Sequence, residues 1–176
     1  MQTPSPIAAD DPRIGELESV VRDLIAAYER LSSLSQDRRQ AMRAADPVAL
    51  GRVIAQESEA VQVVAALEQK RLPLVADLSK RLGAPARTET TITWIAQRLP
   101  GLARERLLSL AQRLRELIST VLKQNETARR TAELLAGHME GLMRQVAAAL
   151  NHGQTYGRGG VVTAGPTVVS ALDVRS

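Results

Sequence analysis

The sequence predicts an all-α protein: an elongated, antiparallel three-helix bundle of coiled-coil character, with one short extra helix and disordered ends. Leucine, alanine and valine supply most of the apolar content, phenylalanine is absent and aromatic residues make up 2% of the 176 residues. This composition suits long helices that pack through aliphatic seams. Apolar residues also recur every three or four positions over long stretches, the period of one helix face. Asp-Pro pairs and glycines mark where helices start and end.

The first helix is expected to end near Ala44. Residues 1–9 are polar and without periodicity, so we expect them to be disordered. Asp10 or Asp11 can accept hydrogen bonds from the first free amides, and Pro12 suits the first helical turn. The predicted core face is Leu17, Val20, Val21, Leu24, Tyr28, Leu31 and Leu34.

The second helix starts with the same signal, Asp46 followed by Pro47, and is expected to end near Leu82. The short link between the two helices favours an antiparallel hairpin. The predicted core face of the second helix is Leu50, Val53, Ile54, Val61, Val64, Leu67, Leu74, Leu78 and Leu82.

A linker over residues 83–86 leads to a short helix that Thr88 or Thr90 can cap. Trp94, between isoleucines, is more typical of a core anchor than of a binding residue. Pro100 and Gly101 then break the helix.

The longest helix is expected from about Leu102 to Leu150. Its first half carries a coiled-coil seam, formed by Leu107, Leu110, Leu114, Leu117 and Val121. Asn125 follows the seam, where a polar residue either fixes register on the buried side or faces water.

The second half of this helix differs in character. Gly137 and Gly141 each cost about 1 kcal/mol of helix stability relative to alanine, and methionines adapt to varied partner surfaces. We expect this apolar stripe to take up a partner chain, although the period alone fits an ordinary core face on the first two helices equally well. The expected binding residues are Leu135, Met139, Leu142, Met143, Val146 and Leu150.

The domain organisation follows: a disordered lead at residues 1–9, a helical domain at 10–150 and a flexible glycine-rich tail at 151–176. Tyr156, one of three aromatic residues, lies in this tail. Two interpretations of this tyrosine remain open: it contacts a partner, or it is simply part of a linker.

Catalytic and metal-binding patterns are missing from the sequence. There is no cysteine, and His138 and His152 lie too far apart for a helical metal site. We therefore expect no enzyme activity, no cofactor and no metal. The net charge of +4 is spread along the chain, which argues against a nucleic-acid stripe. Without cysteines, a signal peptide or a membrane anchor, the expected location is the cytoplasm.

The chain resembles the FlgN family of flagellar export chaperones over most of its length. The likeness rests on patterns in each helix and in the tail, although Arg129 stands where the family often has a second asparagine. The matching stretches are residues 17–31, 44–50, 57–59, 68–70, 121–126 and 156–160.

The resemblance implies a bacterial cytoplasmic chaperone that holds hook-associated proteins by their C-terminal helical regions. It would deliver them to the type III export gate, acting transiently at the membrane through the cytoplasmic domain of the gate protein FlhA. The family's C-terminal helix and tail hold the substrate contacts, and a tail tyrosine, here Tyr156, is implicated in gate docking. Two alternatives remain: a self-associating coiled-coil protein, which could be a homodimer when free of client, and a weakly basic helical protein that binds nucleic acid.

Overall fold

The computed structural model describes residues 11–84 and 90–153, with side chains described as far as Leu150. Over these ranges the protein is all-α, with four helices and no strand. The chain divides into two units, residues 1–128 and 129–176, which are treated separately below. The predicted helical-bundle class is confirmed.

Helix α1, Pro12–Arg43, begins at the predicted signal. Asp11 is the cap, and its Oδ1 accepts a hydrogen bond from the backbone N–H of Arg13 at 2.9 Å. The guanidinium of Arg81 also donates to Asp11, and this bond, more than the one from Arg13, holds the pKa of the Asp11 carboxyl below its ordinary value of 3.8. The other predicted cap, Asp10, lies outside the described residues.

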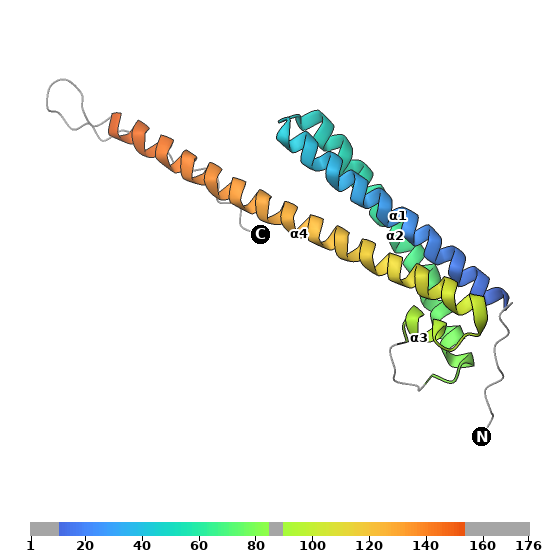
Figure 1. The fold of residues 1–176 in the computed structure, drawn as a ribbon. Helices are drawn as coiled ribbons and strands as arrows, with labels where there is room; N and C mark the ends of the chain where they lie inside the picture. The colour runs from blue at the N-terminus through green and yellow to red at the C-terminus, as the bar shows by residue number, and fades with distance from the viewer. Residues whose placement is uncertain (1–10, 85–89, 154–176) are drawn as a thin grey trace, which may run out of the picture. The chain divides into compact units, whose positions relative to one another are not determined.

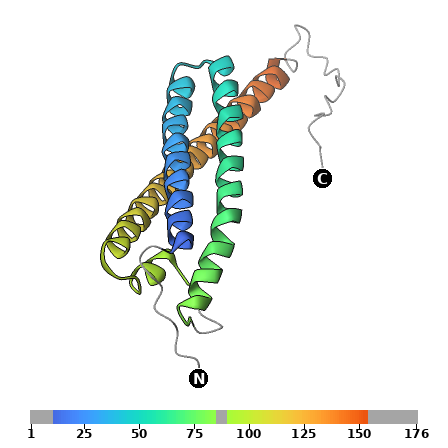
Figure 2. The same ribbon diagram turned by 90° about the vertical axis from the view of Figure 1, so that its right-hand side faces the viewer.

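Helix α2, Pro47–Arg81, is capped by Asp46, whose Oδ1 accepts from the amides of Val48 and Ala49. It runs antiparallel to α1, as predicted from the short link. The two helices lie side by side in Figures 1 and 2, joined by a tight turn at one end. Ion pairs fix the direction: Asp11 bonds to Arg81 at one end, and Arg38 bonds to Glu57 at 2.6 Å towards the other.

Helix α3, Ile92–Ala96, lies at the end of the hairpin opposite that turn (Figure 2). Its cap is Thr91, which accepts from the amide of Trp94 at 3.1 Å, so the prediction of Thr88 or Thr90 is wrong. Thr91 directly precedes the first helical residue, Ile92, which is the position from which a side-chain oxygen reaches the free amide of Trp94. Trp94 packs against the core as expected, with the guanidinium of Arg98 stacked 3.5 Å above its ring.

Helix α4, Gly101–Gly153, packs its first half against the hairpin. It runs parallel to α1, because partners on the two helices increase together in residue number. Glu18 pairs with Arg106 at 3.2 Å, and Glu29 with Arg113 at 2.8 Å. Since α2 runs opposite to α1, residues 101–128 complete an up-down-up three-helix bundle.

The core of this bundle is aliphatic. Side chains with at most 1% exposure come from α1, α2, α3 and α4, so all four helices contribute to it. They include Ile14, Leu17, Leu24, Leu34, Leu78, Ile95 and Leu107. The predicted face of α1 is confirmed, with Tyr28 half-buried at its edge, where burial raises the pKa of the phenol.

The predicted burial is wrong for two residues of α2. Ile54 is 51% exposed and Val61 is 55% exposed, whereas Leu67, Leu74 and Leu78 are buried as expected. Buried contacts of α2 are concentrated on its C-terminal half, where α1, α3 and α4 all surround it. In the N-terminal half only Ala60 is buried.

A polar layer follows Val121, the last buried residue of α4 up to Leu150, where the description of side chains ends. Arg38 pairs with Glu57 and donates to Asn125 Oδ1 at 3.3 Å, while Gln124 donates to Ser32 Oγ at 3.1 Å. Asn125 is itself exposed. Of the two alternatives for this residue, facing water is therefore the one observed, and its side-chain oxygen also accepts a hydrogen bond from Arg38 of α1.

Candidate functional site

The apolar stripe predicted on the second half of the long helix is exposed. Its members lie in the second unit, on residues 129–150 of α4, and each has between 42% and 67% of its surface accessible. They are Leu135, Met139, Leu142, Met143, Val146 and Leu150. Contiguous exposed apolar side chains are typical of surfaces that bind other molecules.

The helix gathers these six side chains on one side. At about 100° per residue they span an arc of about 100°, the width of an ordinary helix-packing face. The charged pairs Arg129–Glu133 (2.8 Å) and Glu140–Arg144 (3.8 Å) lie outside that arc and are spaced four residues apart. This segment is therefore amphipathic by itself, with a continuous apolar side and a charged side.

The glycines do not belong to the apolar side. Gly137 and Gly141 lie about 200° and 240° from Leu135 around the helix, opposite the stripe. A Cβ at either glycine would meet nothing within 4 Å. Their effect on this segment is therefore to lower helix stability. The unbranched, adaptable side chains on the apolar side are those of Met139 and Met143.

Leu134 is a further exposed apolar residue that the sequence pattern did not single out. It is the most exposed large hydrophobic of the chain's described part, at 76%. It lies about 80° from the nearest stripe residue, Leu142, because neighbouring positions on a helix point in different directions. Leu134 is recognised only by its high exposure in the structure, which the period of the sequence does not indicate.

The seam in the first half of α4 is occupied within the chain. Leu107, Leu114, Leu117 and Val121 are all buried, and Leu107 is fully inaccessible. Leu107 and Leu114 belong to the main core cluster and Val121 to the second, in each case together with residues of α1 and α2. This seam cannot form a homodimer without opening the bundle.

A comparison with known protein families identifies the family of the chain. The family described as FlgN protein matches residues 13–163, which is most of the chain. The chain belongs to the FlgN family. No curated protein and no solved structure matches it. FlgN is a family of flagellar export chaperones rather than of enzymes, and the match includes both the bundle and the exposed stripe.

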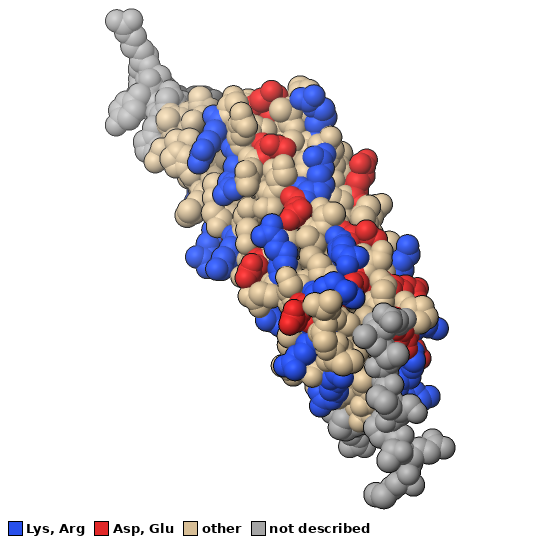
Figure 3. Space-filling view, turned by 45° about the vertical axis from the view of Figure 1, so that its right-hand side comes forward, with Lys and Arg blue, Asp and Glu red and all other residues tan. Residues whose placement is uncertain are grey.

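Other kinds of site are not seen in the described parts of this FlgN protein. No helix within residues 11–84 and 90–153 is long and apolar enough to cross a membrane. In the same ranges no three His, Asp or Glu side chains group as metal ligands. On the face shown in Figure 3, basic and acidic side chains are interspersed, unlike the single-sign stripe of a nucleic-acid interface. Tyr156 lies outside the described residues.

Proposed function

We propose that this FlgN protein is a cytoplasmic chaperone that binds hook-associated proteins through the stripe on α4 and delivers them to the type III export gate. One observation carries the proposal: in a member of an export-chaperone family, six large apolar side chains are exposed along one helix face. Such a face gains free energy when an amphipathic helix of a client covers it. The C-terminal helical regions of hook-associated proteins supply that kind of partner.

The binding mode is helix-on-helix burial. Each Å² of apolar surface removed from water contributes about 25 cal/mol, less the cost of ordering both partners. The charged side of the helix, with Arg129–Glu133 and Glu140–Arg144, stays in water and keeps the free chaperone dispersed.

The test uses purified hook-associated proteins from the same cell, each mixed with the full-length chaperone. We expect one or more to co-elute with it in size-exclusion chromatography at a defined stoichiometry. The client's C-terminal helical region should be protected from proteolysis in the complex. If none of the hook-associated proteins forms a complex, the proposed function is wrong.

Docking at the gate is assigned to Tyr156 in the C-terminal tail. The support is its place in a glycine-rich segment beyond α4, which separates it in sequence from the stripe. We expect Tyr156→Ala to weaken binding of the chaperone–client complex to the cytoplasmic domain of FlhA while leaving client affinity unchanged. Equal affinity of both proteins for that domain contradicts this role.

A second copy of the chain is the occupant proposed for the stripe when no client is present. The same exposed aliphatic side chains suit a homodimer, and the buried seam of Leu107 to Val121 does not. Light scattering should then show a dimer that becomes a chaperone–client complex on addition of client. A monomer at all concentrations contradicts the client-free dimer but leaves client binding intact.

A further inference from the structure

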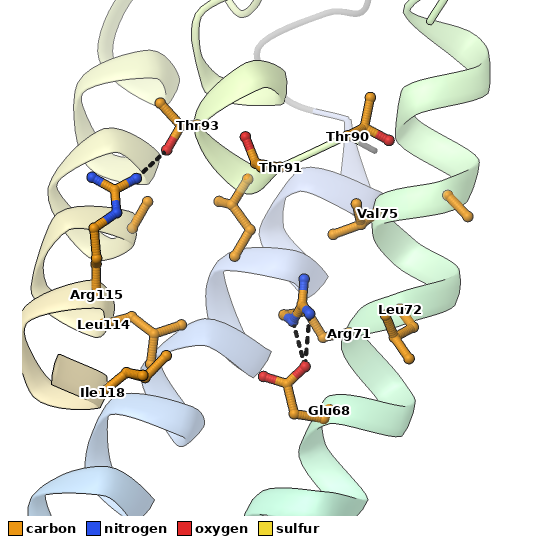
Figure 4. Close-up of a pocket in the computed structure, with 13 residues that line it drawn as sticks. Glu68, Arg71, Leu72, Val75, Thr90, Thr91, Thr93, Leu114, Arg115 and Ile118 are labelled. Carbon is orange, nitrogen blue, oxygen red and sulfur yellow. Dashed lines mark hydrogen bonds and ion pairs between the residues drawn. The ribbon is translucent and has the colours of Figure 1, made fainter. Parts of the chain in front are cut away.

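A groove of about 660 Å³ lies on the first unit, between α2, α3 and the first half of α4. Its size is that of a typical ligand or peptide side-chain pocket. Figure 4 shows its walls: α2 on one side, α4 on the other, and the threonine-rich segment before and within α3 at one end. It is separate from the stripe at residues 135–150, which lies in the other unit.

The walls of the groove are mainly aliphatic. Val75 of α2 and Leu114 of α4 are buried residues of these two walls, and Ile118 of α4 is half-buried. Leu72 lines the groove with 50% of its surface exposed, although the nearby Leu74 and Val75 of the same helix are buried. An aliphatic side chain that enters the groove beside α2 would cover the exposed part of Leu72.

The polar edge of the groove carries an excess positive charge. Arg71 is paired with Glu68 at 2.7 Å, so these two charges cancel. Arg115 donates to Thr93 Oγ1 and to Gln112 Oε1, both at 3.1 Å, and in the described ranges no carboxylate pairs with it. The two arginines and one glutamate of the lining give a net charge of 2 − 1 = +1.

We infer that this groove docks an amphipathic peptide segment of a protein partner, one that places an aliphatic side chain against Leu72 and a carboxylate against Arg115. The hydroxyl of Thr93 already holds the guanidinium in place, so less freedom is lost when a carboxylate binds. A single carboxylate neutralises the groove. A nucleic acid fits poorly, because one unpaired cation beside an aliphatic wall cannot follow a phosphate backbone.

This inference goes beyond the proposed function. It assigns a second peptide-binding surface on the bundle, whichever protein occupies the stripe on α4. Because the two surfaces share no residue, substitutions separate them: groove variants leave the stripe intact, and stripe variants leave the groove intact.

The test selects partners from a phage-displayed library of random 12-residue peptides on the immobilised full-length protein. Enriched peptides are measured by fluorescence anisotropy against three variants. We expect Leu72→Asp to weaken binding about tenfold and Arg115→Gln about two- to fivefold, the effect of losing a partly exposed ion pair. Arg104→Gln, an exposed arginine of α4 outside the groove, is the matched control and should leave the affinity unchanged.

A peptide version with amide in place of carboxylate sharpens the test. It should bind the unsubstituted protein as weakly as Arg115→Gln binds the original peptide, and the two changes together should cost no more than either alone. If Leu72→Asp is not folded by circular dichroism, Leu72→Gln takes its place.

The inference is overturned if selection enriches no peptide, if enriched peptides lack an acidic residue, or if they bind the groove variants as tightly as the unsubstituted protein. A photo-reactive benzoylphenylalanine at position 72 identifies other occupants. Adducts with the selected peptide support the inference. Adducts formed within the chain, or between two copies even when peptide is present, contradict it.

Discussion

Replacing Leu142 and Val146 with aspartate should weaken client binding about a hundredfold without unfolding the protein. These residues lie at the middle of the stripe, one helical turn apart, and are 42% and 56% exposed. Because neither is in the core, the loss in unfolding free energy should stay below about 1 kcal/mol, mostly from the lower helix propensity of aspartate. The two properties, stability and binding, are therefore expected to separate.

The expected loss of binding follows from the exposed area. Fully burying a leucine or valine side chain contributes about 1.5–3 kcal/mol, and about half of each side chain here is still open to a client, so the pair contributes about 2 kcal/mol. Placing carboxylates against an apolar client surface without partners costs at least about 1 kcal/mol more. The total, about 3 kcal/mol, corresponds to a client Kd raised about a hundredfold.

Isothermal titration calorimetry with the identified hook-associated protein measures this change, and urea unfolding checks the fold. Arg144→Asp is the matched control, because it makes the protein more negative by the same two units but lies on the charged side, paired with Glu140. The control should keep client affinity within about threefold, the size of an exposed ion pair. If the folded double variant binds like the unsubstituted protein, the stripe is not the client surface.

Three further predictions concern other parts of the chain. The double variant Gly137→Ala, Gly141→Ala should slow amide hydrogen exchange in the second half of α4, because each alanine adds about 1 kcal/mol of helix stability. Client affinity should stay unchanged, since both positions are open and lie opposite the stripe. Weaker client binding would show that the client needs a deformable helix. Leu107→Ala should lower the unfolding free energy in urea by about 2–5 kcal/mol, because this side chain is fully buried; a loss below 1 kcal/mol contradicts the bundle core. Because folding lowers the pKa of Asp11, its carboxylate stabilises the fold at pH values above the ordinary pKa of 3.8, and this contribution is lost as the pH falls through the lower pKa of the folded state. The difference in unfolding free energy between the unsubstituted protein and Asp11→Asn should therefore shrink below about pH 4 and stay constant from pH 5 to 7.

Helix boundaries were predictable because their signals are local. Asp11 with Pro12, and Asp46 with Pro47, satisfy free amides within three residues, so no distant contact is needed to place either helix start. The six residues of the stripe were predictable as one face for the same reason, since the helical period alone determines which side chains share a side.

Burial was predicted less well, because it depends on which neighbour covers a face. Ile54 and Val61 continue the apolar period of α2, yet they are exposed, whereas Leu67 and Leu74 on the same helix are buried. The sequence pattern treats these four residues alike. The difference arises from α3 and α4, which surround only the C-terminal half of α2.

The sequence by itself determined the all-α class, the starts of α1 and α2, the amphipathic faces and the likeness to FlgN proteins, since each depends on propensity, capping or period along one stretch of chain. Only the tertiary structure decided how the two apolar faces of α4 are used. The seam around Leu107 is buried in the bundle, the stripe around Leu142 is exposed, and Arg115 lies beside an aliphatic groove. These outcomes depend on contacts between residues about 20 to 90 positions apart, such as Arg115 with Thr93 and Arg106 with Glu18, and no local pattern encodes them.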